Sequence, residues 1–264
     1  MNNSTIFPIQ DLPVELARSI FELAALSDGP TLALVSRQVR GWILPVIYEM
    51  VTLGSDDAAL FLRTMKTFPY AFFARHVKRL CLTASVNPHD AARILECCTG
   101  VTSLACWVDF RDPHSPTLPP LLAPLSLRHL SIELENFRLL PLTGALWCSE
   151  LSHLDIRMWE NQDSFVIPDL NYLPSLTHLA IYPGHLELDR FTLERILSQT
   201  ASLRVLCLVI DDDQEEYHER PMLCDPRMVY MPRPEPVPDW EAPYRGLRDT
   251  WSQANEMVAR RMTS

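Results

Sequence analysis

Three evenly spaced histidines are the residues of this chain whose spacing most clearly suggests chemistry. His129, His153 and His178 follow one another at intervals of 24 and 25 residues. On neighbouring strands about 4.8 Å apart, the outer two would lie roughly 9.6 Å apart at the backbone. Zinc would then need both outer rings to lean inward and a fourth ligand such as Asp155. Histidines that face a protein partner explain the same pattern without a metal or another cofactor. We therefore predict that these histidines contact a protein partner.

The three histidines lie in a repeated sequence pattern, and the repeated structure must position them. The pattern aliphatic-x-x-Leu-x-apolar occurs six times at intervals of 24 to 27 residues, starting at Val77, Val101, Leu127, Leu151, Leu176 and Leu203. This period is typical of leucine-rich repeats, in which each unit supplies a short strand and a returning helix or irregular segment. A unit buries its apolar side only when a neighbour stacks on it. The sequence therefore predicts stacked parallel strands over 77–210, with Leu130, Leu154 and Leu179 in the core.

The repeats are irregular. Residues 90–98 and 191–197 predict returning helices, whereas 111–124, with five prolines, predicts a loop. The asparagine typical of such repeats, eight residues after the first position, is missing from all six units. The backbone groups that an asparagine ladder would satisfy must therefore find other partners.

The third, fifth and seventh residues of each unit should point out of the concave side of the strand stack. We predict that a protein partner binds this face, through Arg79, Trp107, His129, His153, Asp155, Arg157, His178 and Tyr182. Trp, Arg and Tyr are enriched at binding hot spots. Trp107 and Tyr182 could equally pack under loops.

Ahead of the repeats, the sequence predicts three short helices. Asp11 can cap the first, and an apolar stripe follows it at Leu12, Leu16, Ile20 and Leu23. Gly29-Pro30 should end this helix, a second should run from Leu32 to the proline at position 45, and a third should pass through 46–50.

These residues resemble the F-box. The matching positions are Leu-Pro-x-Glu-Leu at 12–16, Ile-Phe at 20–21, Leu-x-x-Val-Ser-Arg at 32–37 and Trp42, whereas 27–31 and Ser36 depart from the family pattern. With the repeats, the chain is similar to fungal F-box proteins that carry irregular leucine-rich repeats. The resemblance implies a non-catalytic substrate receptor, which docks to a Skp-type adaptor of a cullin ubiquitin ligase. The adaptor-binding residues it implies are Leu12, Pro13, Leu16, Ile20, Leu32 and Val35. The alternative is an interaction scaffold whose helices only cap the repeats.

The composition of the chain limits the classes of partner and function that we expect. A net charge of −10 and a pI near 5.2 argue against nucleic acid or an anionic membrane as the main partner. Seven cysteines without a C-x-x-C pair favour reduced thiols in the cytoplasm or nucleus. The sequence shows neither a secretory leader nor a membrane-spanning stretch. No hydrolase, phosphate-loop or metalloprotease motif occurs, so we do not expect an enzyme.

The predicted fold is therefore α/β, with an F-box at 1–51 and a linking helix in 52–76, around 58–68. The repeat array fills 77–210 as a solenoid of parallel strands. Residues 211–264 should form an acidic, proline-rich loop, a possible last strand at 228–231 and a C-terminal helix. That helix should cap the open end of the array, because its apolar residues Leu247, Trp251, Ala254, Val258 and Met262 share one face.

Overall fold

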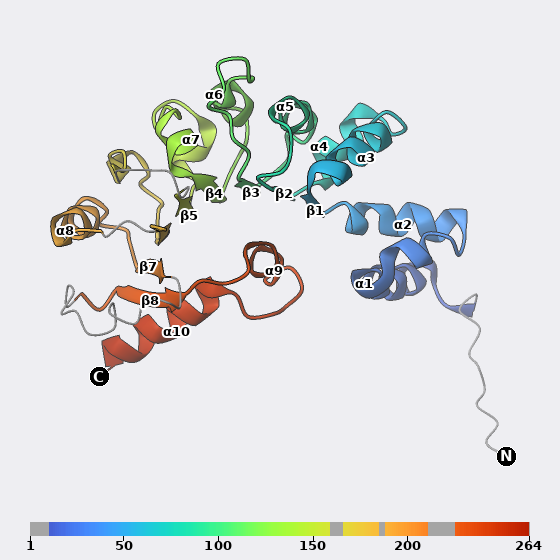
Figure 1. Cartoon of the computed structure of the whole chain (residues 1–264). Helices are drawn as coiled ribbons and strands as arrows, with labels where there is room; N and C mark the ends of the chain where they lie inside the picture. Colours follow the sequence, from blue (N-terminus) through green and yellow to red (C-terminus); the bar gives the residue numbers. More distant parts are fainter. Residues whose placement is uncertain (1–10, 159–165, 185–187, 211–224, 264) are drawn as a thin grey trace. The chain divides into compact units, whose positions relative to one another are not determined.

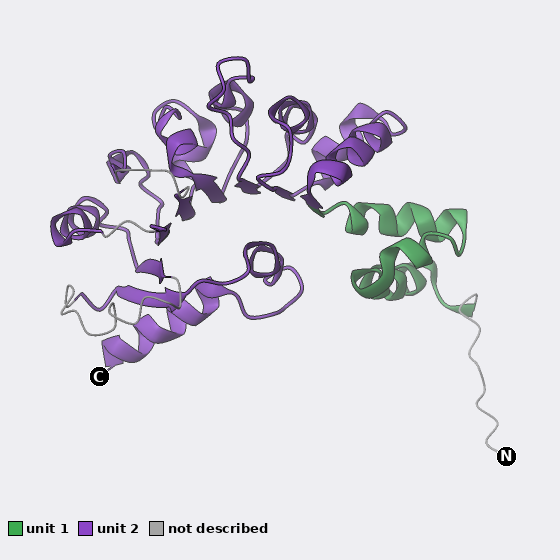
Figure 2. Ribbon diagram, viewed as in Figure 1, with its two compact units in different colours: residues 1–51 green, residues 52–264 purple. Residues whose placement is uncertain are grey.

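The computed structural model describes residues 11–158, 166–184, 188–210 and 225–263. The chain divides into two compact units, residues 1–51 and residues 52–264 (Figure 2). The acidic run at 211–216 and Trp159 lie outside the described residues. Among the described helices, none combines the length and the apolar composition that crossing a membrane requires.

Unit 1 contains two helices, α1 (Val14–Leu32) and α2 (Arg37–Ile47). Its core is small: Ala25, Val39 and Ile43 are buried, and Phe21 and Trp42 pack against them. Gly29 lies tightly against α2, because a Cβ at this position would come within 2.7 Å of the Ile47 side chain. A larger residue at position 29 would force the Ile47 side chain to shift.

Several predictions for unit 1 were wrong. Pro13, rather than Asp11, is the N-cap of α1. The helix break predicted at Gly29-Pro30 is present one residue earlier, as a kink at the non-helical Asp28, although the helix resumes through Pro30 to Leu32. The second helix starts at Arg37 instead of Leu32, because the Ser36 hydroxyl accepts a hydrogen bond from the Val39 N–H and caps the helix there. It then continues through Pro45. The third helix does not form, since the chain enters strand β1 (Met50–Leu53).

Unit 2 is built on an eight-stranded sheet whose strands follow chain order, β1 to β8. Every pair from β2 to β8 is parallel, so the α/β class is confirmed. The other strands are β2 (Arg79–Leu82), β3 (Ser103–Cys106), β4 (His129–Glu133), β5 (His153–Arg157), β6 (His178–Tyr182), β7 (Val205–Ile210) and β8 (Met228–Pro232).

Helices α3 to α8 lie along one side of the sheet, which we call the outer side (Figure 1). They are α3 (Ser55–Met65), α4 (Tyr70–His76), α5 (Pro88–Cys97), α6 (Leu118–Leu122), α7 (Leu134–Arg138) and α8 (Arg190–Gln199), with 3-10 turns η2 (Leu146–Ser149) and η3 (Leu170–Tyr172). The single linking helix is instead two helices separated by Pro69, the N-cap of α4. The proline-rich loop at 111–124 contains α6, since proline is tolerated in a first helical turn.

The core lies between the sheet and the outer helices. Leu130, Leu154 and Leu179 are at most 1% exposed, which confirms their predicted place in the core. Hydroxyl groups at the second position of two repeats add hydrogen bonds to carbonyls that backbone N–H groups also use. Ser152 Oγ donates to the carbonyl of Arg128, and Thr177 Oγ1 donates to that of Ser152. The buried Asn136, one residue past its expected slot, donates to the Val108 carbonyl.

The C-terminal segment does not cap the end of the sheet as predicted. Helices α9 (Pro236–Glu241) and α10 (Thr250–Thr263) lie across the other side, the inner side of the sheet (Figure 1). Trp240 of α9 packs against Trp107, and the buried Ala254 and Val258 of α10 pack against β6, β7 and β8. The inner side is apolar on β6 and β7, at Ala180, Val205 and Cys207, and packing of α10 there removes this apolar surface from water.

Candidate functional site

The three histidines form a stacked ladder on the inner side of the sheet. His129 pairs in register with His153, and His153 pairs with His178. Their ring centroids are 4.2 and 4.1 Å apart, and the second pair is nearly parallel at 8°. The Trp251 ring of α10 meets His153 and His178 edge-on. The ladder therefore joins three strands to the C-terminal helix.

This geometry does not favour a zinc site. The lone pair of an imidazole nitrogen lies in the ring plane, so parallel stacked rings direct their lone pairs side by side rather than toward one point. In the described part of the chain, no group of three or more His, Cys, Asp or Glu side chains is placed to hold a metal ion.

Neighbouring hydroxyls orient two of the rings. Because Ser152 Oγ gives its hydrogen to the Arg128 carbonyl, its oxygen accepts from His153 Nδ1 at 2.9 Å. Thr177 Oγ1 does the same for His178 Nδ1 at 2.8 Å. His178 Nε2 then faces Asn255 Oδ1 at 3.1 Å. Since an amide oxygen only accepts, this contact is a hydrogen bond when His178 carries its second proton.

The ladder is neutral at physiological pH. Burial, followed by the neighbouring Arg79, lowers the pKa of His129 to about 4, although His129 keeps an exposed edge. Burial and the two flanking histidines lower the pKa of His153 to about 3. Burial also lowers the pKa of His178, against the opposing effect of Asn255. The three rings therefore act as packing groups near neutral pH.

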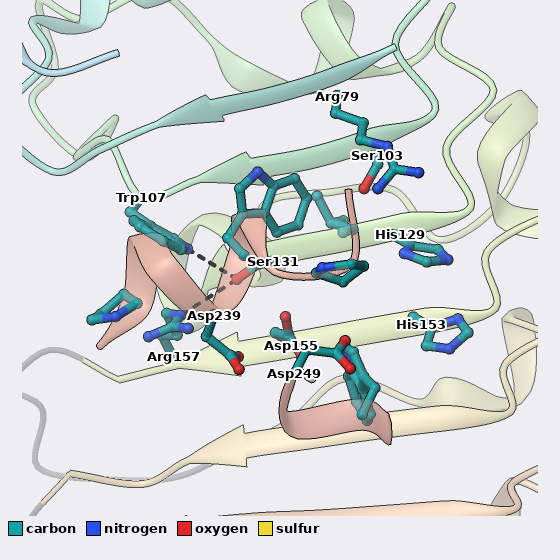
Figure 3. Close-up of a pocket in the computed structure, with 15 residues that line it drawn as sticks. Arg79, Ser103, Trp107, His129, Ser131, His153, Asp155, Arg157, Asp239 and Asp249 are labelled. Atoms are coloured by element: carbon teal, nitrogen blue, oxygen red, sulfur yellow. Dashed lines mark hydrogen bonds between the residues drawn. The ribbon is translucent and has the colours of Figure 1, made fainter. Parts of the chain in front are cut away.

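A second cluster centres on Arg157, the last residue of β5. Its guanidinium carbon lies 4.7 Å from the Trp107 ring centroid and 4.0 Å from that of Tyr182, so two aromatic rings hold one cation. The buried Ser131 hydroxyl accepts from Trp107 Nε1 at 2.9 Å and from Arg157 Nε at 3.3 Å (Figure 3). These contacts fix the charge of Arg157 against the sheet.

Asp155 lies between the two clusters. Burial raises its pKa to about 7; the Arg157 guanidinium and a hydrogen bond from Ser131 oppose this rise, and the carboxylates of Asp239 and Asp249 contribute to it. Asp239 accepts from the Thr250 N–H at 2.8 Å. Asp249 accepts from the Ser252 N–H at 2.9 Å and so caps α10. Three carboxylates from the sheet and its cover thus face one another.

A cavity of about 170 Å³ separates the sheet from this cover. Asp155, Arg157 and His153 line it from the sheet, and Asp239 and Asp249 line it from the C-terminal segment (Figure 3). Its lining contains three carboxylates and two guanidinium groups, those of Arg79 and Arg157. Aromatic and charged side chains around a partly covered cavity of this kind can bind a small polar or charged group.

The predicted open concave face is therefore wrong as a surface. The structure brings all eight predicted residues to the inner side, but Trp107 is only 8% exposed and Tyr182 only 4%. His153, Asp155, Arg157, His178 and Arg79 are half-buried, and His129 alone is exposed. The prediction took the inner rows as free because it treated the C-terminal helix as an end cap.

Sequence reasoning missed the site residues of the C-terminal segment: Asp239, Trp240, Asp249 and Asn255. It also left Ser131 out of the predicted site, although it had placed Ser131 on the inner face. The one available signal was Trp251, which lies on the predicted apolar stripe of the last helix. A helix with tryptophan on its apolar face needs a surface to pack against, and the inner side supplies the rings of His153 and His178.

The predicted adaptor-binding residues lie in unit 1. Pro13, Leu16, Ile20 and Val35 are exposed, whereas Leu12 and Leu32 are half-buried, the latter against the core of unit 1. Leu16, Ile20 and Leu23 are 54%, 47% and 70% exposed and follow one another at helical spacing on α1. Unit 1 thus presents an apolar row that its own two helices leave uncovered.

Comparison with models of protein families, with characterised proteins and with solved structures finds no match to this chain.

Proposed function

We propose that the protein is a non-catalytic substrate receptor of a Skp-cullin-F-box ubiquitin ligase. Unit 1 would be the F-box that docks to the adaptor, and unit 2 an irregular leucine-rich-repeat solenoid that recognises a protein substrate. The setting would be the cytoplasm or nucleus, in keeping with free thiols at all six described cysteines.

The observation that carries the proposal is the apolar surface of unit 1. Besides Leu16, Ile20 and Leu23, α1 exposes Val14 and Leu26, and the turn after it exposes Leu34 and Val35. Single exposed apolar residues are ordinary, but a small unit that exposes this many is typical of a docking module. An amphipathic helix with an uncovered apolar row suits recognition of a partner's apolar groove.

Substrate recognition by unit 2 must accommodate the covered inner side. The accessible part of the predicted partner face is its edge at His129, next to the half-buried Arg79. A substrate would therefore bind across this edge and the exposed side of α10.

Co-purification of the full chain with a Skp-type adaptor tests the proposal. Replacing Leu16 and Ile20 together by Asp should weaken adaptor binding by more than about tenfold, because two charges would be buried at the interface. Phe191→Asp is the matched control, since Phe191 is equally apolar and 74% exposed but lies on α8 of unit 2. It should leave adaptor binding unchanged.

The competing function is an interaction scaffold without a ligase. It predicts that the Leu16/Ile20 variant and the parent behave alike in the adaptor experiment. Circular dichroism of both variants separates this outcome from loss of folding.

A further inference from the structure

The cavity on the inner side of the sheet has a charge pattern that adaptor docking does not use. Its three carboxylates, Asp155, Asp239 and Asp249, outnumber its two guanidinium groups. Both arginines already face aromatic rings, Arg79 over Tyr244 and Arg157 over Trp107 and Tyr182. None of the ion pairs formed within the described ranges includes any of the three carboxylates. Burial raises the pKa of Asp155 to about 7, so above this pH all three carboxylates offer negative charge to a ligand, and the binding tests below are made at about pH 8.

The walls of the cavity are aromatic. Trp107 lines it from the sheet, and Trp240 and Trp251 line it from the C-terminal segment. Trp240 Nε1 is buried and has no hydrogen-bond acceptor among the described residues. Aromatic faces attract cations and also pack against alkyl chains. Rings and carboxylates together suit a ligand with a cationic head and a short apolar stem.

The chain itself supplies an example of this recognition. Arg157 places its guanidinium group between Trp107 and Tyr182, next to Asp155. The free space beside Arg157 has a volume of about 170 Å³, which is enough for a second cationic group. An apolar cavity of about 150 Å³ in another protein holds benzene, so a ligand of fewer than about ten heavy atoms would fit.

We propose that this cavity binds a small organic cation, an alkylammonium or alkylguanidinium group, offered either by a free molecule or by a lysine or arginine side chain of a bound protein. The cationic head meets Asp155 and Asp239, and the alkyl stem packs against Trp240 and Trp251. The site belongs wholly to unit 2 and does not depend on adaptor docking.

Isothermal titration of the full chain, with no adaptor present, tests the site. The probes are n-butylguanidinium and n-butylammonium, and the matched controls are butyramide, which is neutral, and butyrate, which is anionic. We expect at least one cation to bind with a Kd of about 1 mM or tighter, and both controls to bind at least about tenfold more weakly. Butyrate binding as tightly as the cations, or no saturable cation binding, would overturn the proposal.

Two variants locate the binding. Asp155→Asn keeps the size of the side chain and should weaken cation binding at least about tenfold. Glu194→Gln removes a carboxylate from the outer helix α8, where Glu194 pairs with Arg190, and should change the Kd by less than about twofold. Equal affinity of the parent and Asp155→Asn would place the cation elsewhere and overturn the assignment.

A peptide-binding experiment distinguishes the two sources of the cation, a free molecule and a protein side chain. The probe is an unstructured Gly-Ser peptide with one central arginine, and its control carries glutamine at that position. Binding of the arginine peptide alone, lost in Asp155→Asn, supports recognition of a protein side chain. Binding of n-butylguanidinium without either peptide supports a free molecule as the ligand.

Discussion

The imidazole rings of His153 and His178 lie face to face, with centroids 4.1 Å apart and planes inclined by 8°. Trp251 of α10 closes the stack edge-on, 5.3 Å from His153 and 5.5 Å from His178. Two cations at this separation would repel each other, so the contact requires that at least one ring be neutral. The junction between the sheet and its C-terminal cover is therefore sensitive to acid.

The first prediction is that the protein loses stability as the pH falls. In the unfolded chain His153 takes up a proton near its ordinary pKa of 6.5, whereas in the folded protein it does so only at about 3. Between these values the unfolded state binds more protons, so acid favours unfolding. Allowing for solvent around the half-buried ring, His153 should contribute a loss of about 1 kcal/mol between about pH 7 and pH 5.

Urea unfolding at a series of pH values measures this loss. His153→Phe keeps a flat ring in the stack and removes the proton, so its unfolding free energy should change less with pH in that range than that of the parent. A variant with the same pH slope as the parent would show that the ladder is not what makes the fold sensitive to acid.

The second prediction concerns Asp155, which acts in the opposite direction. Its pKa is raised from 3.8 to about 7, mainly by burial, so the folded state holds a proton that the unfolded state has already released. Stability from this group is present at low pH and is lost as the pH rises through this window. Asp155→Asn should therefore stabilise the protein by on the order of 1 kcal/mol above about pH 7. Thermal unfolding should show little effect below about pH 4, and a destabilised variant at high pH would refute this account.

The third prediction concerns the contact between His178 Nε2 and Asn255 Oδ1, 3.1 Å apart. This hydrogen bond favours the protonated ring and raises the pKa of His178, against the larger lowering by burial. Asn255→Ala should therefore lower the pKa of His178 further. Nuclear magnetic resonance titration of the His178 ring in the parent and in the variant measures the change. An unchanged His178 curve would mean that Asn255 does not act on its proton.

The fourth prediction tests the strand phase. Leu154 is fully buried in the core between the sheet and the outer helices. Leu154→Ala should therefore reduce the free energy of unfolding by about 2 to 5 kcal/mol. Leu139→Ala removes the same atoms from a residue that is 56% exposed and should cost less than about 0.5 kcal/mol. Limited proteolysis compares the two variants. Equal resistance would show that Leu154 does not face the core.

The sequence predicted the strands well because their apolar pattern is local and repeated. The two apolar residues of each Leu-x-apolar step lie on the same face of a strand and bury that face. Six such steps at a regular interval favour stacking of each strand beside the next one in the chain. The returning helices at α5 and α8 were predicted for the same reason. The short helices α6 and α7 were missed, since proline-rich or five-residue segments carry too little periodicity.

By itself, the sequence determined the register of the histidines. Side chains alternate strictly along a strand, so residues at the same position of successive repeats must lie side by side. Only the tertiary structure decided which surface covers them. The apolar stripe of α10 could be buried against any apolar surface within reach. The periodicity of the stripe does not indicate which surface that is. The chain folds α9 and α10 over the inner side, where Asp239 of α9 lies near Asp155 and Trp251 of α10 meets the histidines, and so replaces an open concave face by a partly covered cavity.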